Sequence, residues 1–170
     1  MQPQVYFDDV EVGQEIPSLT KNVNTVNILM YCAAVWLMDR IHFDNPYAVK
    51  RRGLPDIVAP GNMAGDYYVQ LLTDWAGEKG RLKKVGLQFR NFMIPGNVLT
   101  CGGRITGKSV EDSKGRVDLE LWIRNQDGVV CVPGKGVVEL PMRAVNVTSF
   151  ASRSTCLPSC TVPKGCPLEA

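Results

Sequence analysis

The stretch NMAGDYYVQLLTDW, residues 62–75, decides how the rest of the chain can fold. Its apolar side chains recur every three or four positions, and this spacing predicts a helix with one wide buried face. The members of that face are Met63, Ala64, Tyr67, Tyr68, Leu71, Leu72 and Trp75. Gly77 and Gly80 follow directly and are expected to end the helix. A helix with so wide an apolar face is expected to pack against a sheet.

The sequence after this helix predicts an antiparallel meander. In RVDLELWIRN, residues 116–125, apolar and polar side chains alternate, as they do in a strand with one buried face. Residues 85–89 and 98–109 contain further strand-like runs, and we expect a bulge or bend at Gly102 and its glycine neighbour in the second run. The turn QDG, residues 126–128, leads into a last strand, VVCVPGKGVVEL.

The sequence before the helix predicts a short opening strand, a second helix and an irregular segment. YFDDVEVGQEI, residues 6–16, is interpreted as the strand. Asn24 stands at the N-cap position of a helix over about residues 25–36. Proline and glycine keep residues 39–60 from forming one long helix. This order of elements predicts an α+β fold with helices on one face of a curled antiparallel sheet.

Length and composition indicate a single globular domain. The chain has 170 residues, of which 45% are hydrophobic and 21% charged. A net charge of +2 is too small to indicate a nucleic-acid-binding surface. The sequence has no apolar run long enough to span a membrane, and its acidic start lacks the apolar region of a secretory signal. We therefore expect a cytoplasmic protein without nucleic-acid or membrane partners.

The C-terminal residues differ in character from the rest of the chain. We expect residues 1–143 to form the domain and residues 144–170, which contain Cys, Pro, Ser and Thr, to form a disordered extension. The three cysteines of the extension lack the spacing and the nearby histidine of a zinc site, so we expect no metal and no cofactor. Cys32, Cys101 and Cys131 lie in apolar segments and are expected to be reduced and buried.

His42 is the only histidine of the chain and stands in WLMDRIHFDNPYA, residues 36–48. It lies in the irregular segment, between Asp39 and Asp44, and such segments commonly carry function. A neutral imidazole can act as an acid and a base near pH 7, because its unperturbed pKa lies close to that pH. A lone histidine can equally be structural, so the residues alone leave both interpretations open.

Three stretches resemble the MaoC-like (R)-specific enoyl-CoA hydratases and dehydratases of the hot-dog fold. They are FDDVEVGQEIP (7–17), RIHFDNPYA (40–48) and IVAPGNMAG (57–65). The resemblance implies a curled antiparallel sheet wrapped around the buried helix 62–75, and dimers whose sheets join. It also implies reversible addition of water across the 2,3-double bond of an acyl thioester, carried by coenzyme A or an acyl carrier protein.

The resemblance further implies which residues form the site. His42 would be the acid/base, and the N–H of Gly61, at the start of the central helix, would help to form an oxyanion hole. The position of the usual aspartate of the family, five residues before His42, is Leu37. Asp39 is the expected substitute, because residues spaced i,i+3 on a helical turn can meet. Asp44 matches a position that caps or orients the segment.

Substrate contacts are also expected from the resemblance. Tyr67 would line the acyl tunnel, although plain core packing is an alternative. Arg51 and Arg52 would meet the phosphates of coenzyme A, although a solvated surface is the usual role of such residues.

Three accounts of function stay open. In the first, the chain is an active hydratase in which Asp39 replaces the missing aspartate. In the second, it is a degenerate subunit of a heteromeric hydratase, because residues 65–107 resemble the small subunit of such assemblies. In the third, the scaffold serves cyclisation, isomerisation, thioester hydrolysis or acyl binding, with Asp66 as the carboxylate available for hydrolysis.

Overall fold

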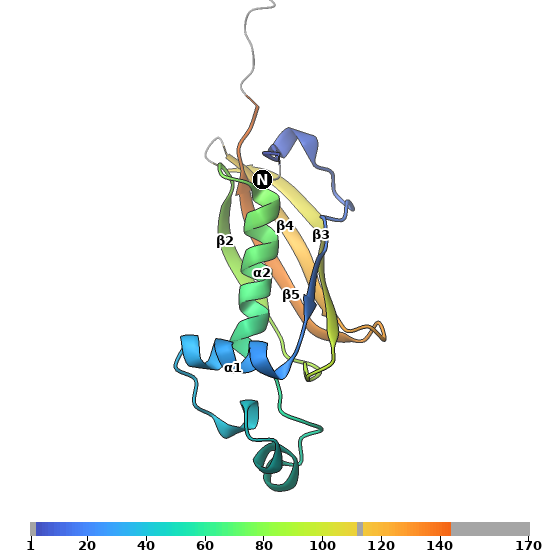
Figure 1. Ribbon diagram of the computed structural model, residues 1–170. Helices are drawn as coiled ribbons and strands as arrows, with labels where there is room; N and C mark the ends of the chain where they lie inside the picture. The colour runs from blue at the N-terminus through green and yellow to red at the C-terminus, as the bar shows by residue number, and fades with distance from the viewer. Residues whose placement is uncertain (1–2, 112–113, 144–170) are drawn as a thin grey trace, which may run out of the picture.

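A computed structural model describes residues 3–111 and 114–143. Figure 1 shows a curled antiparallel sheet that wraps around one long helix, α2 (Gly61–Ala76), with the strand order β1-β3-β4-β5-β2. The strands are β1 (Leu19–Asn22), β2 (Arg81–Leu87), β3 (Val98–Glu111), β4 (Lys114–Arg124) and β5 (Val130–Leu140). This is the hot-dog architecture, which confirms the predicted α+β class.

The core lies between α2 and the concave face of the sheet. In β4, Val117, Leu119, Leu121 and Ile123 are buried and alternate with more exposed polar residues, as predicted. On β5, glycine lets the helix approach: a Cβ atom on Gly136 would lie 2.9 Å from the Leu72 side chain. Helix α2 ends at Gly77, whose φ of +73° suits glycine.

The irregularity in β3 lies between Ile105 and Gly107, and the prediction of a bulge at Gly102 was wrong. Gly102 stays in register opposite Trp122 on β4. A Cβ atom on Gly102 would lie 2.8 Å from the indole nitrogen of Trp122. The glycine therefore makes room for a cross-strand aromatic ring and does not bend the strand.

The expected opening strand over residues 6–16 is also absent from the described structure. Residues Phe7–Asp9 form a 3-10 turn, η1, and Glu15 makes only an isolated bridge to β3. The first strand, β1, begins later, at Leu19.

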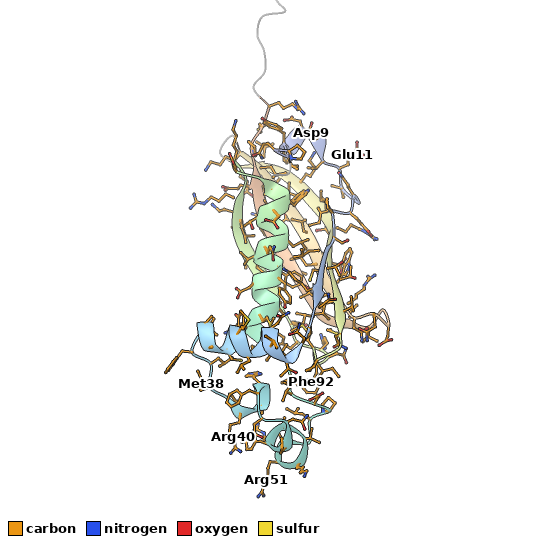
Figure 2. All side chains as sticks on the ribbon, viewed as in Figure 1. Asp9, Glu11, Met38, Arg40, Arg51 and Phe92 are labelled. Carbon is orange, nitrogen blue, oxygen red and sulfur yellow. The ribbon has the colours of Figure 1, made fainter. Side chains whose placement is uncertain are left out.

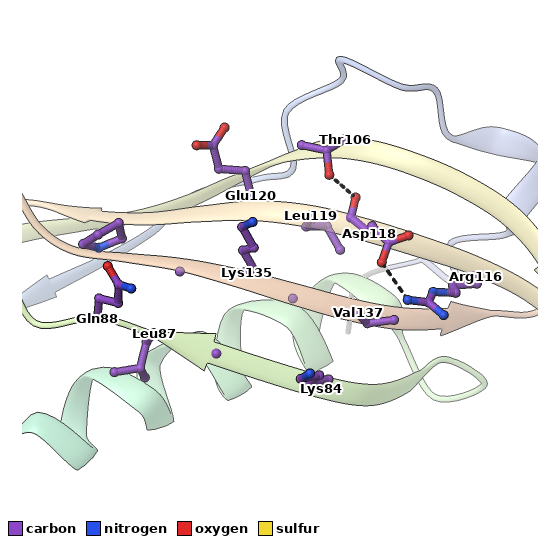
Figure 3. A pocket seen from close by; sticks show the side chains of 14 residues that line it. Lys84, Leu87, Gln88, Thr106, Arg116, Asp118, Leu119, Glu120, Lys135 and Val137 are labelled. Atoms are coloured by element: carbon purple, nitrogen blue, oxygen red, sulfur yellow. Dashed lines mark hydrogen bonds and ion pairs between the residues drawn. The ribbon is translucent and has the colours of Figure 1, made fainter.

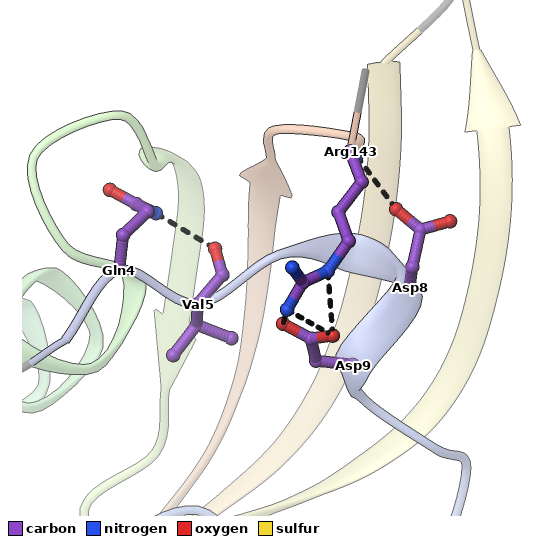
Figure 4. A network of polar contacts seen from close by, with 5 residues as sticks. All are labelled: Gln4, Val5, Asp8, Asp9 and Arg143. Atoms are coloured by element: carbon purple, nitrogen blue, oxygen red, sulfur yellow. Dashed lines mark hydrogen bonds and ion pairs between the residues drawn. The ribbon is translucent and has the colours of Figure 1, made fainter. Parts of the chain in front are cut away.

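An ionic clamp holds this turn against the last described residue of the chain, Arg143. The Asp9 carboxylate accepts hydrogen bonds from Nε and Nη2 of Arg143, at 3.0 and 2.8 Å, and the Asp8 carboxylate accepts one from the Arg143 backbone N–H at 2.8 Å (Figure 4). The guanidinium lowers the pKa of the Asp9 carboxyl below its usual value. The clamp thus joins the two ends of the predicted domain. The predicted extension, residues 144–170, lies outside the described residues.

Helix α1 (Thr25–Ala34) and the residues after it lie at the end of α2 where that helix begins (Figure 1). The Asn24 side chain accepts a hydrogen bond from the Asn27 N–H at 2.8 Å, so the predicted N-cap is confirmed. The helix ends two residues earlier than predicted, and Trp36 follows with a φ of +56° and 82% exposure. Two short turns come next, η2 (Arg40–His42) and the π-helical η3 (Tyr47–Arg51).

Within the described residues, none of the helices is both long and apolar enough to cross a membrane. Cys32, Cys101 and Cys131 are free and buried, as predicted.

Candidate functional site

The backbone around His42 is fixed on two sides. The Asp39 carbonyl accepts a hydrogen bond from the His42 N–H at 3.1 Å, which closes the turn η2. The carbonyl of Ile41 accepts one from the Val58 N–H at 3.1 Å, which ties the turn to the extended residues 57–60 that lead into α2. The His42 side chain is 7% exposed. The imidazole is therefore a positioned group at the edge of the core.

One ring nitrogen of His42 has a partner that determines which of the two nitrogens carries the proton in the neutral ring. Nδ1 lies 2.7 Å from the carbonyl oxygen of Val58. A carbonyl only accepts hydrogen bonds, so Nδ1 must carry the proton. In the neutral imidazole the lone pair is then on Nε2, the nitrogen that can take a proton from water. His42 therefore has the fixed tautomer that a general base requires.

The predicted side-chain pair of Asp39 and His42 is not formed. The Asp39 carboxylate accepts a hydrogen bond from the Ile41 N–H at 3.2 Å and so caps the turn η2. A carboxylate that caps its own turn points back at the backbone, and here the backbone carbonyl of Val58 takes its place at the ring. Asp39 therefore does not replace the aspartate that is missing at the position of Leu37.

The other two carboxylates of the segment also have local partners. Asp44 accepts from the Arg40 guanidinium at 2.6 Å and from the Tyr47 N–H at 3.1 Å, and these contacts lower its pKa. Asp56 accepts from the side-chain amide of Asn45 at 2.6 Å. Asp44 therefore orients the segment and starts η3. No carboxylate of the described residues hydrogen-bonds the imidazole.

The beginning of α2 forms the second part of the site. Its N-cap residue, Pro60, makes no side-chain capping hydrogen bond. The N–H groups of a first helical turn have no partner within the helix and carry the positive end of the helix dipole, so the Gly61 N–H can bind an anionic oxygen. Gly61 lies three steps along the chain from Val58, a separation of at most about 11 Å. The structure thus brings His42 and Gly61 to the two ends of one short segment.

An aromatic ring that the sequence analysis did not single out covers Gly61. A Cβ atom on Gly61 would lie 2.5 Å from Cζ of Phe89, a distance that real Cβ atoms do not reach. Phe89 follows β2 and is 60% exposed. Its alternation with Val85 and Leu87 in the sequence was the available signal, because it places all three side chains on the face toward α2.

Tyr67 and Asp66 lie farther along α2. Tyr67 is partly buried, and burial raises its pKa to about 12. The Asp66 carboxylate accepts a hydrogen bond from the Tyr31 hydroxyl at 2.7 Å, so this pair joins α2 to α1. Burial, together with this hydrogen bond, raises the pKa of Tyr31 to about 12. Asp66, the carboxylate that the hydrolysis account requires, is therefore hydrogen-bonded to Tyr31.

Arg51 and Arg52 stand at the end of η3. Figure 2 shows Arg51 at the far end of the molecule, pointing away from the sheet. Neither arginine forms an ion pair within the described part of the chain. Among the described residues, no hydrogen bond joins Arg51 to the His42 imidazole, whose partner is the Val58 carbonyl.

A broad hollow of about 960 Å³ lies on the outer face of the sheet, away from α2 (Figure 3). Lys84, Gln88, Thr106, Arg116, Asp118, Glu120 and Lys135 contribute its polar side chains. Arg116 is paired with Asp118 at 3.1 Å and with Glu111 at 3.0 Å. None of His42, Gly61 and Phe89 lines this hollow, which is therefore separate from the candidate site.

No protein-family model and no curated protein matches the sequence. Solved structures match in fold. An (R)-hydratase from A. caviae involved in PHA biosynthesis is 22% identical, covers 78% of this chain and 98% of its own, and has a TM-score of 0.67. The ChsH1-ChsH2 complex from Mycobacterium tuberculosis is 22% identical, covers 76% of this chain and 98% of its own, and has a TM-score of 0.67. A MaoC-like dehydratase from Rhodospirillum rubrum is 18% identical, covers 83% of this chain and 99% of its own, and has a TM-score of 0.72. The chain thus has the fold of MaoC-like dehydratases and (R)-hydratases, as the three sequence stretches predict.

Proposed function

We propose that this chain adds water to, or removes it from, the 2,3-double bond of an acyl thioester carried by coenzyme A or a carrier protein. One observation carries the proposal. The Val58 carbonyl holds Nδ1 of His42, and the segment that begins at Val58 ends at the uncapped first turn of α2. In this proposal, the base and the oxyanion site are the two ends of one short piece of backbone.

The chemistry uses both ends. Nε2 of His42 takes a proton from water while the water oxygen forms a bond to C3 of the enoyl group. The electrons of the double bond move toward C2 and the thioester oxygen, where the Gly61 N–H stabilises the negative charge. The imidazolium, held through Nδ1 by Val58, then returns its proton to C2. The net reaction adds one water, and the reverse sequence removes it.

The remaining substrate contacts are proposed with this reaction. Tyr67, partly buried on α2, would line the path of the acyl chain. Arg51 and Arg52 are exposed and would meet the phosphates of coenzyme A. Asp44 would act indirectly, by holding the segment that carries His42.

A second candidate is a subunit that works only when paired with another hot-dog chain. Two observations favour it. The imidazole has no carboxylate partner in the described residues, and α1 exposes an apolar stripe at helical spacing. The stripe and the residues that continue it are Val26, Leu29, Met30, Ala33 and Trp36. Such a surface fits a second copy of this chain or a different hot-dog chain.

The test is the loss of absorbance of an enoyl-CoA during hydration. We expect His42→Ala to reduce kcat/KM for crotonyl-CoA by about 100-fold or more, the scale of general acid/base catalysis. Circular dichroism and Tm control for folding. Unchanged hydration in a folded variant would contradict the proposal. The second candidate expects no hydration by the purified chain and recovery on adding a second hot-dog chain.

A further inference from the structure

Two glycines of α2 meet two side chains at and just beyond the end of β2. Gly61 and Gly65 are four residues apart on the helix, about 6 Å along its axis. Leu87, the last residue of β2, and Phe89 are two residues apart, about 6.6 Å along an extended backbone. A Cβ atom on Gly65 would lie 3.5 Å from the Leu87 side chain, an ordinary contact, whereas a Cβ atom on Gly61 would lie 2.5 Å from the Phe89 ring. Alanine at position 65 would therefore make an ordinary contact, whereas alanine at position 61 would require the end of the Phe89 side chain to shift.

The backbone that carries Phe89 is fixed. The N–H of Gln88 donates to the Pro133 carbonyl at 2.9 Å, and the N–H of Arg90 donates to the Cys131 carbonyl at 2.9 Å. The phenyl ring can therefore move only by rotation about its own side-chain bonds. Phe89 is 60% exposed, so part of its side chain is open to contact with a ligand.

We propose that Phe89 is the residue that limits the length and bulk of the acyl chain accepted at this site. The inference rests on the proposed function, because Gly61 is there the donor to the thioester oxygen. A thioester bound at Gly61 brings C2 and C3 of its acyl group next to whatever covers this glycine. The ring of Phe89 is that cover, and it presents an apolar surface to the chain.

The contact itself is tested by a double-mutant cycle on Tm. We expect Gly61→Ala to lower Tm, and the addition of Phe89→Ala to recover part of the loss, because the truncated side chain no longer meets the new methyl group. The matched pair Gly65→Ala and Leu87→Ala should show no such recovery, since the Gly65 position has normal space. Additive effects of Gly61→Ala and Phe89→Ala would overturn the contact.

The specificity is tested by chain-length profiles. The ratio of kcat/KM for octenoyl-CoA to that for crotonyl-CoA should rise about 10-fold or more in Phe89→Ala, the effect of changing the room for methylene groups in an apolar site. The control is Phe92→Ala, because Phe92 belongs to the same loop and is 57% exposed. In parallel, calorimetry with butyryl-CoA and octanoyl-CoA should show the same shift in relative affinity without any turnover.

The outcomes separate the two proposals. Hydration by the wild-type chain with an unchanged profile in Phe89→Ala overturns the role of Phe89 and leaves the reaction standing. Acyl-CoA binding whose length preference shifts in Phe89→Ala, but without hydration, supports the role of Phe89 and contradicts the reaction. Absence of both binding and hydration in the wild-type chain contradicts both.

Discussion

The sheet around α2 and the irregular segment that carries His42 are held together in different ways. In the first region, buried apolar side chains interlock, and a glycine on β5, Gly136, leaves room for the Leu72 side chain of α2. In the second, residues 39–60 bury few side chains and are held mainly by single hydrogen bonds, such as those at Asp39, Asp44 and Val58. The first region therefore determines stability, whereas the second positions chemical groups.

The largest effect should come from opening the core. Leu72 is 0% exposed, so we expect Leu72→Ala to lower the free energy of unfolding by about 2–5 kcal/mol. Leu29→Ala is the matched control, because Leu29 is exposed on α1. Denaturant unfolding of both variants measures the difference. Equal losses of unfolding free energy in the two variants would contradict the claim that the core, and not the surface, determines stability.

The same contrast explains what the sequence could predict. Periodicity identifies α2 and the strands because burial imposes a repeat on every residue of such elements, as in residues 116–125. The site depends on single contacts that no repeat encodes. Asp39 stands at a suitable spacing from His42, yet its carboxylate turns back to the Ile41 N–H. Likewise, alternation places Phe89 on the face toward α2 without revealing that it covers Gly61.

The next prediction concerns Asp39 and separates capping from catalysis. Asparagine caps a turn as well as aspartate but cannot serve as a charged partner of an imidazole. We expect Asp39→Asn to keep hydration activity within a few-fold of wild type, and Asp39→Ala to lose about 1 kcal/mol of stability. Steady-state kinetics and denaturant unfolding measure both. If Asp39→Asn lost as much hydration activity as His42→Ala, the result would support a catalytic Asp39–His42 pair after all.

The smallest effect should come from the clamp between Asp9 and Arg143. The folded pKa of Asp9 is lowered, so the clamp contributes fully above the unfolded pKa near 3.8 and is lost as pH falls through the lower folded value. We expect Asp9→Asn to reduce Tm slightly at pH 7. The Tm difference from wild type should disappear in strong acid and at high salt. A Tm difference that persists in acid would show that the clamp acts through something other than charge.

The central claim is that Val58 fixes the proton of His42 on Nδ1 and leaves Nε2 free to act as a base. Because His42 is the only histidine of the chain, ¹⁵N NMR of protein labelled in histidine reports this one ring without overlap. Above the pKa of the imidazole, the account predicts a protonated Nδ1 and an unprotonated Nε2, with Nε2 as the nitrogen that responds when an acyl-CoA is added. A neutral ring that carries its proton on Nε2 would contradict it.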